Sequence, residues 1–222
     1  MNILPEINKL ASYLNDIGIT DPIEQDLYVE ILKSEAEDLG FHPATDGILI
    51  CHLNLDGTSM IGEDERPFAE LRHADGQLPE PGRRYNMRYK SGTHLFFSRR
   101  LKKLLEEKDY CIITEGAKKA SVLSCLGFPC IGIIGWCSWR KTGTDELHAD
   151  FNQIDVAGRT FYLLPDFDGA FNPDIHREIR KLSLALYKYG AEKIKLMKLP
   201  PVSGEKMGVD DFLMSLKESQ NV

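Results

Sequence analysis

The second half of the chain alternates short apolar runs with amphipathic stretches, and this alternation constrains the fold more than any other feature. The apolar runs have the length of strands and lie at 110–114, 129–134, 160–165 and 193–198. Stretches with helical periodicity lie near 116–126, 173–189 and 209–217. Continuous apolar runs are typical of strands that are buried on both faces, as in a parallel sheet. The pattern therefore predicts an α/β fold with a mainly parallel four-stranded sheet.

Residues 1–107 carry a different pattern and are expected to form a smaller α+β subdomain. Two helical stripes are indicated, one by Ile3, Ile7, Leu10 and Leu14 and one by Leu27, Ile31 and Leu32. Strand-like segments follow at 47–53, 68–71 and 87–89, separated by turn sequences rich in Asp, Gly and Pro. We therefore divide the chain into an N-terminal subdomain, 1–107, and a second domain, 108–222.

The charges are distributed unevenly along the chain. The formal net charge of -7 argues against indiscriminate binding to polyanions. However, residues 1–80 hold 17 acidic and 4 basic side chains, whereas residues 81–105 hold 8 basic side chains and no acidic ones. A basic segment, residues 83–103, therefore lies beside an acidic region. This segment can still attract phosphate groups at short range, within about a Debye length.

The basic segment interleaves cations with aromatic rings, a composition that suits single-stranded nucleic acid or nucleotide phosphates. Its candidate contact residues are Arg83, Arg84, Arg88, Lys90, Arg99 and Arg100. After the expected strand at 129–134, Trp136 and Trp139 could stack a base, and Arg140 could hold a phosphate. The alternatives are a basic surface that pairs with the acidic region, and tryptophans that pack against the core.

The chain has no apolar stretch near the roughly 20 residues that a membrane-spanning helix needs, and its start lacks the features of a signal peptide. We therefore expect a cytoplasmic protein with no membrane partner. The five cysteines lie in apolar contexts, which suits reduced and buried thiols. A zinc site at Cys125, Cys130 and Cys137 is disfavoured because the spacing is irregular and contains no CxxC pair.

Carboxylates stand where two of the expected strands end. Glu115 follows the run at 110–114, and Asp166 and Asp168 follow the run at 160–165. Ligands of open parallel sheets bind beyond the carboxyl ends of the strands, and residues two apart in an extended segment point the same way. Mg²⁺ prefers a few carboxylates together with waters and phosphate oxygens. These acids are therefore predicted to share one metal-bound phosphate. The alternative for Asp166 and Asp168 is an ordinary Asp-rich turn, and the alternative for Glu115 is an acid that caps a helix.

Lysines and further acids flank these positions. Lys118 and Lys119 follow Glu115-Gly116-Ala117, where a helix is expected to begin, and the lysines and the helix N-terminus together attract anions. Asp210 and Asp211 open the last expected helix. Either can simply cap that helix, which is the favoured interpretation, and Asp210 is also a candidate metal ligand.

Taken in order, these motifs resemble the TOPRIM domain that DnaG-type primases, topoisomerases and OLD-family nucleases share. The matching features are Glu115-Gly116, the glycine-bearing strand end at 132–135, Asp166-Phe167-Asp168 and Asp210-Asp211. The sequences at 113–120 and 208–213 are similar, more specifically, to the DUF3854 group of TOPRIM-like domains, common in primase-helicase proteins of phages, plasmids and integrative elements. Weaker similarity upstream extends the resemblance over residues 40–217.

The resemblance implies a Rossmann-like sheet, Mg²⁺ or Mn²⁺ at Asp166 and Asp168, and Glu115 as a general acid or base in making or breaking phosphodiesters. Lys118 and Lys119 would neutralise phosphate charge beside that glutamate. The implied partners are DNA or RNA, single strands above all, together with nucleotides and a helicase or primase. The sequence shows no zinc-binding primase module, no Walker A loop and no assignable topoisomerase tyrosine. A reduced standalone role or a piece of a larger protein is therefore expected.

Three functions are compatible with these motifs. The first is a primase-associated nucleotidyltransferase module in the replication of a mobile element. The second is an OLD-type nuclease that uses the same acids to direct water at phosphorus. The third is a non-catalytic module that binds single strands or a helicase partner. The motifs alone do not distinguish synthesis from cleavage, or DNA from RNA.

Overall fold

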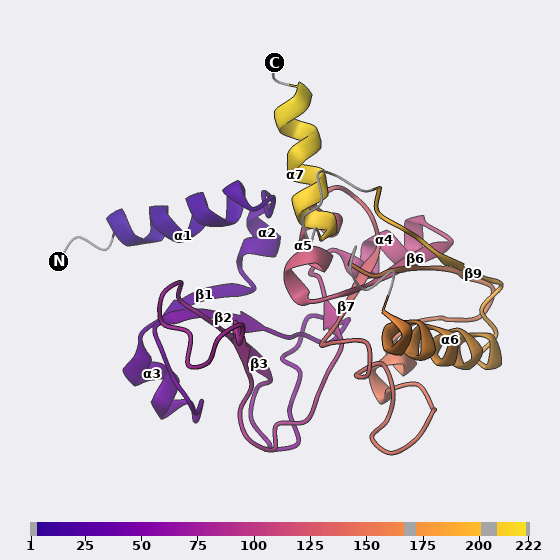
Figure 1. Ribbon diagram of the computed structural model, residues 1–222, viewed down its shortest axis with the longest axis horizontal. Helices are drawn as coiled ribbons and strands as arrows, with labels where there is room; N and C mark the ends of the chain where they lie inside the picture. The colour runs from indigo at the N-terminus through magenta and orange to yellow at the C-terminus, as the bar shows by residue number, and fades with distance from the viewer. Residues whose placement is uncertain (1–3, 167–171, 201–207, 221–222) are drawn as a thin grey trace.

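The computed structural model describes residues 4–166, 172–200 and 208–220 of the chain, which form two β-sheets flanked by helices (Figure 1). The helices are α1 (Leu4–Asp16), α2 (Pro22–Gln25), α3 (Lys33–Asp38), α4 (Leu101–Glu107), α5 (Ala117–Cys125), η1 (Ala149–Gln153), α6 (Pro173–Lys188) and α7 (Val209–Gln220). The strands are β1 (Tyr28–Ile31), β2 (Gly47–Cys51), β3 (Ala69–His73), β4 (Tyr85–Asn86), β5 (Phe96–Phe97), β6 (Tyr110–Glu115), β7 (Cys130–Ile133), β8 (Thr160–Leu164) and β9 (Lys193–Leu196). Within the described ranges, no helix combines the length and the apolar character needed to cross a membrane.

The second half of the chain forms a five-stranded sheet in the order β5-β7-β6-β8-β9. The strands β7, β6, β8 and β9 are parallel to one another and correspond to the four apolar runs of the sequence. The expectation of four strands was incomplete, because β5 adds a fifth, antiparallel strand beside β7. Because β5 is only two residues long, it shows no hydrophobic periodicity that could predict a strand, and its pairing with β7 identifies it.

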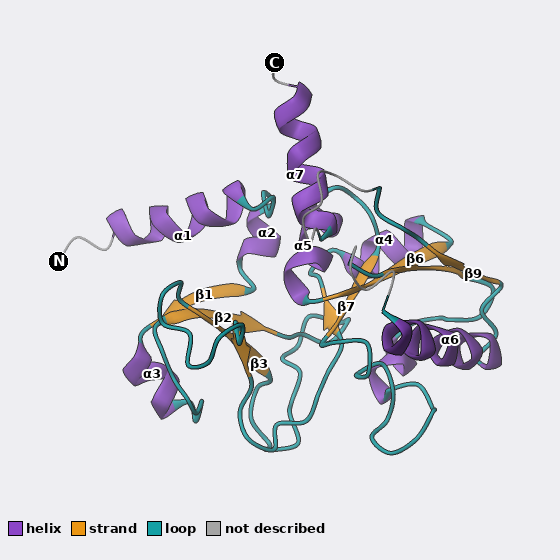
Figure 2. Cartoon of the chain, viewed as in Figure 1, coloured by secondary structure: helices purple, strands orange, loops and turns teal. Residues whose placement is uncertain are grey.

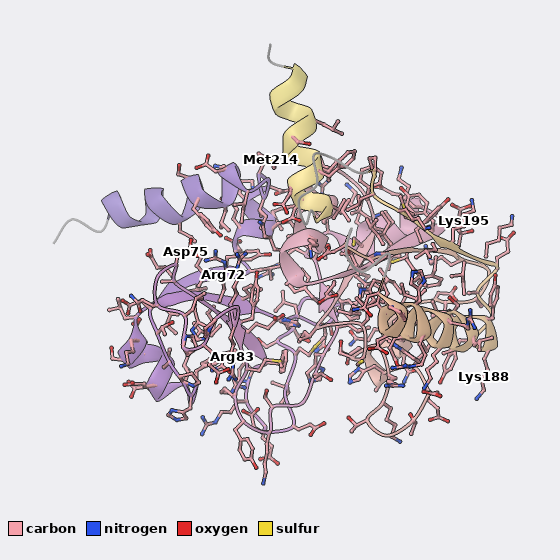
Figure 3. All side chains as sticks on the ribbon, viewed as in Figure 1. Arg72, Asp75, Arg83, Lys188, Lys195 and Met214 are labelled. Atoms are coloured by element: carbon pink, nitrogen blue, oxygen red, sulfur yellow. The ribbon has the colours of Figure 1, made fainter. Side chains whose placement is uncertain are left out.

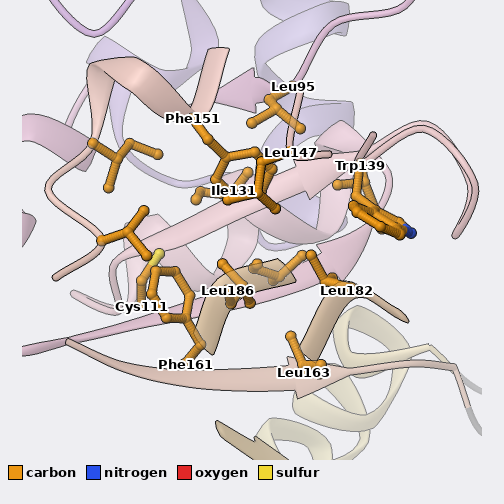
Figure 4. Packing of buried hydrophobic residues seen from close by; sticks show 14 of the residues in the cluster. Leu95, Cys111, Ile131, Trp139, Leu147, Phe151, Phe161, Leu163, Leu182 and Leu186 are labelled. Atoms are coloured by element: carbon orange, nitrogen blue, oxygen red, sulfur yellow. The ribbon is translucent and has the colours of Figure 1, made fainter. Parts of the chain in front are cut away.

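Helices cover both faces of this sheet, so that its strands are buried on both sides. Alternate residues of β6 show the division: Cys111 and Ile113 pack in one core with α4, η1 and α6, whereas Ile112 packs in a second core with α5 and α7. Figure 4 shows the first core, in which Phe161 and Leu163 of β8 contact Leu182 and Leu186 of α6. This three-layer arrangement explains the continuous apolar runs that predicted the strands.

The N-terminal half forms a separate four-stranded antiparallel sheet in the order β1-β2-β3-β4 (Figure 2). Two local predictions are wrong here. The stripe at Leu27, Ile31 and Leu32 suggested a helix, but residues 28–31 form β1, because pairing with β2 overrides a weak helical preference. The strand expected at 87–89 is instead β4 at 85–86.

The two sheets are joined by buried polar contacts. The hydroxyl group of Tyr28 on β1 lies 2.9 Å from Ser121 Oγ on α5, and both residues are buried. The carboxylate of Glu24 is also buried and accepts hydrogen bonds from Ser124 Oγ and from the backbone N–H of Arg100 at 3.0 Å each. Burial raises the pKa of Glu24, although these hydrogen bonds offset part of the effect. The division of the chain at residue 107 stays a prediction.

We expect Tyr28→Phe and Ser121→Ala each to lower the free energy of unfolding by about 0.5–1.5 kcal/mol, because each removes one partner of a buried hydrogen bond. The double variant should lose less than the sum of the two single losses, since both remove the same bond. Urea denaturation of the four proteins measures this coupling. Tyr89→Phe is the matched control, because Tyr89 is 83% exposed. Strict additivity of the two losses would contradict the contact.

Candidate functional site

Glu115 lies at the point where β6 ends and the chain turns into α5. Gly116 makes this turn with a φ of 93°, a conformation that disfavours residues with a side chain. The turn is held against β7 by a hydrogen bond from Gly116 N–H to the carbonyl of Ile133 at 2.8 Å. A Cβ atom at Gly132 would lie only 2.9 Å from the carbonyl oxygen of Gly116, so β7 also needs a glycine here. The two glycines therefore fix where the Glu115 carboxylate stands.

Asp166 lies two residues beyond β8 and reaches the same edge of the sheet. The parallel register places Thr114 opposite Leu164, and the Thr114 hydroxyl group donates to the Leu164 carbonyl at 3.0 Å. The Asp166 carboxylate forms an ion pair with Lys119 Nζ at 2.7 Å. The structure thus brings Glu115, Asp166 and the first turn of α5 together, as the sequence predicted. Asp168 lies outside the described residues.

Asp210 also reaches this edge, from the first turn of α7. Its side chain is almost completely buried, and its Oδ2 atom lies 2.8 Å from Lys118 Nζ. Burial by itself disfavours the charged lysine, but attraction to Asp210 outweighs it and raises the pKa of Lys118. The helix-capping interpretation applies to Asp211 instead, whose carboxylate accepts the Gly208 N–H at 3.2 Å.

These groups line a cleft of about 410 Å³ between the two sheets. From the second half of the chain it is lined by Glu115, Asp166, Asp210, Lys118 and Lys119, among others. From the first half it is lined by Glu70, Arg84 and Tyr85. Acidic and basic side chains therefore face each other across a cavity large enough for a nucleotide-sized ligand.

Glu70 is a cleft residue that the sequence analysis missed. It lies on β3, is buried, and its Oε1 atom is 2.8 Å from His52 Nε2, while His52 Nδ1 is 3.1 Å from the Leu95 carbonyl oxygen. Both nitrogens of His52 thus face oxygen atoms, and the histidine holds the Glu70 side chain in place from the core side. No sequence signal marks Glu70, because a single acid in a short strand is ordinary until the strand is placed against the cleft.

The basic segment does not form one continuous surface. Arg84 lines the cleft, and Lys90 and Arg99 are exposed. By contrast, Arg88 is buried and donates to Asp64 at 2.7 and 3.1 Å, which leaves it a structural role rather than an exposed contact.

Other cations of the segment also pair with the acidic region. Arg100 pairs with Asp21 at 3.1 Å, and Arg83, labelled in Figure 3 beside the first sheet, lies 3.7 Å from Glu80. These contacts match the alternative in which the basic segment neutralises the acidic region. They leave Arg84 as the cation of this segment that is placed to meet a ligand in the cleft.

The tryptophans do not offer base-stacking surfaces. Trp139 is fully buried and Trp136 is 4% exposed, and both pack in the core on the α6 side of the sheet. The stacking interpretation is therefore wrong, and the alternative of packing in the core is correct. Arg140 lies over the Trp139 ring and pairs with Asp145 at 2.8 Å and with Glu178 at 3.3 Å. Arg140 therefore ties the loop after β7 to α6.

The acids of the cleft fit a hydrated divalent cation. A Cβ atom at Gly208 would lie 2.5 Å from Asp210 Oδ1, 2.7 Å from Lys119 Cε and 3.5 Å from Asp166 Oδ1, so both oxygens and the Lys119 side chain gather beside this glycine. Asp210 Oδ1 is buried and has no hydrogen-bond partner within the described ranges. A carboxylate oxygen in that state is costly, and a cation would satisfy it. In the structure, Lys118 and Lys119 supply the positive charge instead.

Comparison with known proteins gives one family and a set of similar folds. Residues 102–220 match the family model described as "Domain of unknown function (DUF3854)". None of the curated proteins matches the sequence. The zinc-binding and RNA polymerase domains of Aquifex aeolicus primase are 17% identical, with a TM-score of 0.61, over 95% of this chain and 53% of that one. The DnaG catalytic core is 14% identical, with a TM-score of 0.60, over 100% of this chain and 72% of that one.

The chain thus spans about half of the Aquifex structure that it resembles. At these identities the likeness establishes a shared α/β fold.

We expect Lys118→Ala to lower the free energy of unfolding by about 1–3 kcal/mol, because it leaves the buried carboxylate of Asp210 without its cation. Thermal or urea denaturation measures the loss. Lys33→Ala is the control, since Lys33 forms an exposed pair with Glu37 at 3.7 Å and should change stability by less than about 0.5 kcal/mol. Equal effects of the two substitutions would contradict a stabilising role for the buried pair.

Proposed function

The chain belongs to the DUF3854 family, and from this premise we propose that it is a Mg²⁺-dependent TOPRIM protein that acts on nucleic-acid phosphodiesters. Its most fitting role is that of a primase-associated nucleotidyltransferase module in the replication of a mobile element. The observation that carries the proposal is the convergence of Glu115, Asp166 and Asp210 with two lysines in one cleft. The fold shared with the DnaG catalytic core agrees with it.

The acids and lysines at the ends of β6 and β8 have distinct roles in this proposal. Asp166 and Asp210, with Asp168 as a further candidate, would hold Mg²⁺ or Mn²⁺, which when bound supplies Lewis-acid polarisation of a phosphate oxygen. Glu115 accepts the proton of the attacking hydroxyl group, because a carboxylate fixed at a strand end can act as a general base. Lys118 and Lys119 turn from their aspartates toward the phosphates and neutralise the charge that enters with them.

The walls of the cleft position the substrate. α5 begins at Ala117, just beyond the turn at Gly116, and the backbone N–H groups of its first turn favour an anion at this position. Arg84 approaches from the opposite wall and can bind a backbone phosphate of a single strand. A template strand is therefore expected to enter between the two sheets, with nucleotides at the edge formed by β6 and β8.

We expect Glu115→Gln to lower the rate of metal-dependent nucleotidyl transfer by about 10²–10⁴-fold, because it removes the general base. Asp166→Asn should abolish the Mg²⁺- or Mn²⁺-dependent activity, because it removes a proposed metal ligand. The assay incubates labelled and unlabelled single strands with nucleotides and either metal, and measures the length of the labelled products. Glu107→Gln, an exposed change on α4, is the control and should keep the full rate.

The same assay separates the competing functions. Lengthening of the strand identifies synthesis, whereas shortening identifies an OLD-type nuclease that uses the same acids. Salt-sensitive binding without turnover, unaffected by EDTA, identifies a non-catalytic module. An activity that Glu115→Gln and Asp166→Asn leave unchanged would overturn the assignment of the cleft.

We expect Arg84→Ala to weaken the binding of single-stranded DNA or RNA and to reduce the salt slope of log K by about 1, because one phosphate contact is lost. Fluorescence anisotropy at several salt concentrations measures both quantities. Lys103→Ala is the control from the same basic segment, because its side chain is 72% exposed on α4 and pairs only weakly with Glu107. Equal changes in both variants would argue against binding in the cleft.

A further inference from the structure

A second cluster of possible metal ligands lies outside the cleft. It consists of His94, in the loop before β5, together with His148 and Asp150, at the start of η1. One ligand atom from each residue lies within 4.8 Å of the other two. The three residues come from segments more than fifty positions apart, so the fold alone brings them together. None of them lines the cleft of the proposed function.

The distances within the cluster suit a single small ion. His94 Nδ1 and His148 Nδ1 each lie 3.1 Å from Asp150 Oδ2. Two ligand atoms that share a tetrahedral Zn²⁺ ion at about 2.0–2.2 Å stand about 3.3–3.5 Å apart. An ion therefore needs only a small expansion of this arrangement.

Both histidines aim a ring nitrogen at the same carboxylate oxygen of Asp150. His148 Nδ1 also lies 3.2 Å from the backbone nitrogen of Asp150. An imidazole nitrogen and a carboxylate oxygen 3.1 Å apart hold either a proton or a cation between them.

The backbone around the cluster is fixed by the core. Leu95, Leu147 and Phe151, each a chain neighbour of one ligand, are all buried and lie in the main hydrophobic core (Figure 4). The Leu95 N–H also donates to Asp150 Oδ2 at 2.8 Å and orients the carboxylate, as outer hydrogen bonds do in metal sites. The side chains of His94 and His148 remain 14% and 17% exposed, which leaves a path for an ion and a water.

We propose that His94, His148 and Asp150 form a binding site for one divalent transition-metal ion of the zinc class. Two imidazoles and one carboxylate are ligands that suit Zn²⁺, Co²⁺ or Ni²⁺, whereas Mg²⁺ prefers oxygen ligands alone. The site is thus chemically distinct from the acidic cleft.

The ion has a structural role with a link to the cleft. Asp150 holds the Leu95 N–H, the Leu95 carbonyl oxygen faces His52, and His52 contacts Glu70 on the cleft wall. An ion bound by Asp150 therefore stiffens the segment that positions this wall. The proposal does not depend on the catalytic function proposed for the cleft.

The test uses the full chain, stripped with a chelator and titrated with Zn²⁺ or Co²⁺ in the presence of excess Mg²⁺. We expect one equivalent of metal to bind, with a visible Co²⁺ spectrum of low coordination number and a rise in Tm. Asp150→Asn should weaken the binding by more than about tenfold. Its amide oxygen can still accept the Leu95 N–H, so the fold is kept, as the Tm without metal will show. His42→Ala is the control, because His42 is exposed and remote in sequence from the cluster.

A measurement on the unmodified chain makes the test independent of how variants fold. Zn²⁺ should protect His94 and His148, but not His42, from acylation by diethylpyrocarbonate, as read by peptide mass spectrometry. Protection of this pair supports the site. Absence of protection, no binding at one equivalent, or binding that Asp150→Asn leaves unchanged would overturn it and indicate that the cluster shares only protons.

Discussion

The parallel pairing of β6 with β7 and β8 determines where the acids at the strand ends lie. It sets the strand ends level, so that Glu115 and Asp166 emerge at one edge of the sheet. The close approach of Gly116 and Gly132 then turns the chain into α5 with no room for a side chain between the strands. The position of the acids is therefore a consequence of backbone geometry, and not of the acids themselves, whose mutual repulsion opposes their approach.

Two lysines resolve that repulsion. Lys118 and Lys119 both lie in the first turn of α5, yet they pair with acids from different elements, Asp210 on α7 and Asp166 after β8. The ion pairs thereby join three elements around the cleft. In the proposed function the same lysines change partners when a metal and a phosphate enter, so that Asp166 and Asp210 have a cationic partner in both states.

The N-terminal sheet contributes a wall to the site and much of the charge balance of the chain. Acidic side chains in the loops and helix caps around it pair with cations of the basic segment, for instance Asp64 with Arg88 and Asp21 with Arg100. An excess of basic residues in a stretch of sequence therefore overstates the positive surface available to nucleic acid, because some of these residues pair with acids inside the protein. The His94, His148 and Asp150 cluster stands at the junction of this sheet with β5 and offers a second, chemically different way to fix the same wall.

The four parallel strands, the helices α5, α6 and α7, and the acids and lysines at the strand ends could all be predicted from residue order, because burial on both faces and tight turns produce recognisable sequence patterns. The pairing of residues 28–31 as a strand, the fifth strand β5, and the burial of Trp136, Trp139 and Arg88 became visible in the folded chain alone. The tertiary structure also added Glu70 to the cleft and joined the two histidines to Asp150. These features depend on partners far away along the chain, and a local pattern carries no information about which distant segment will supply them.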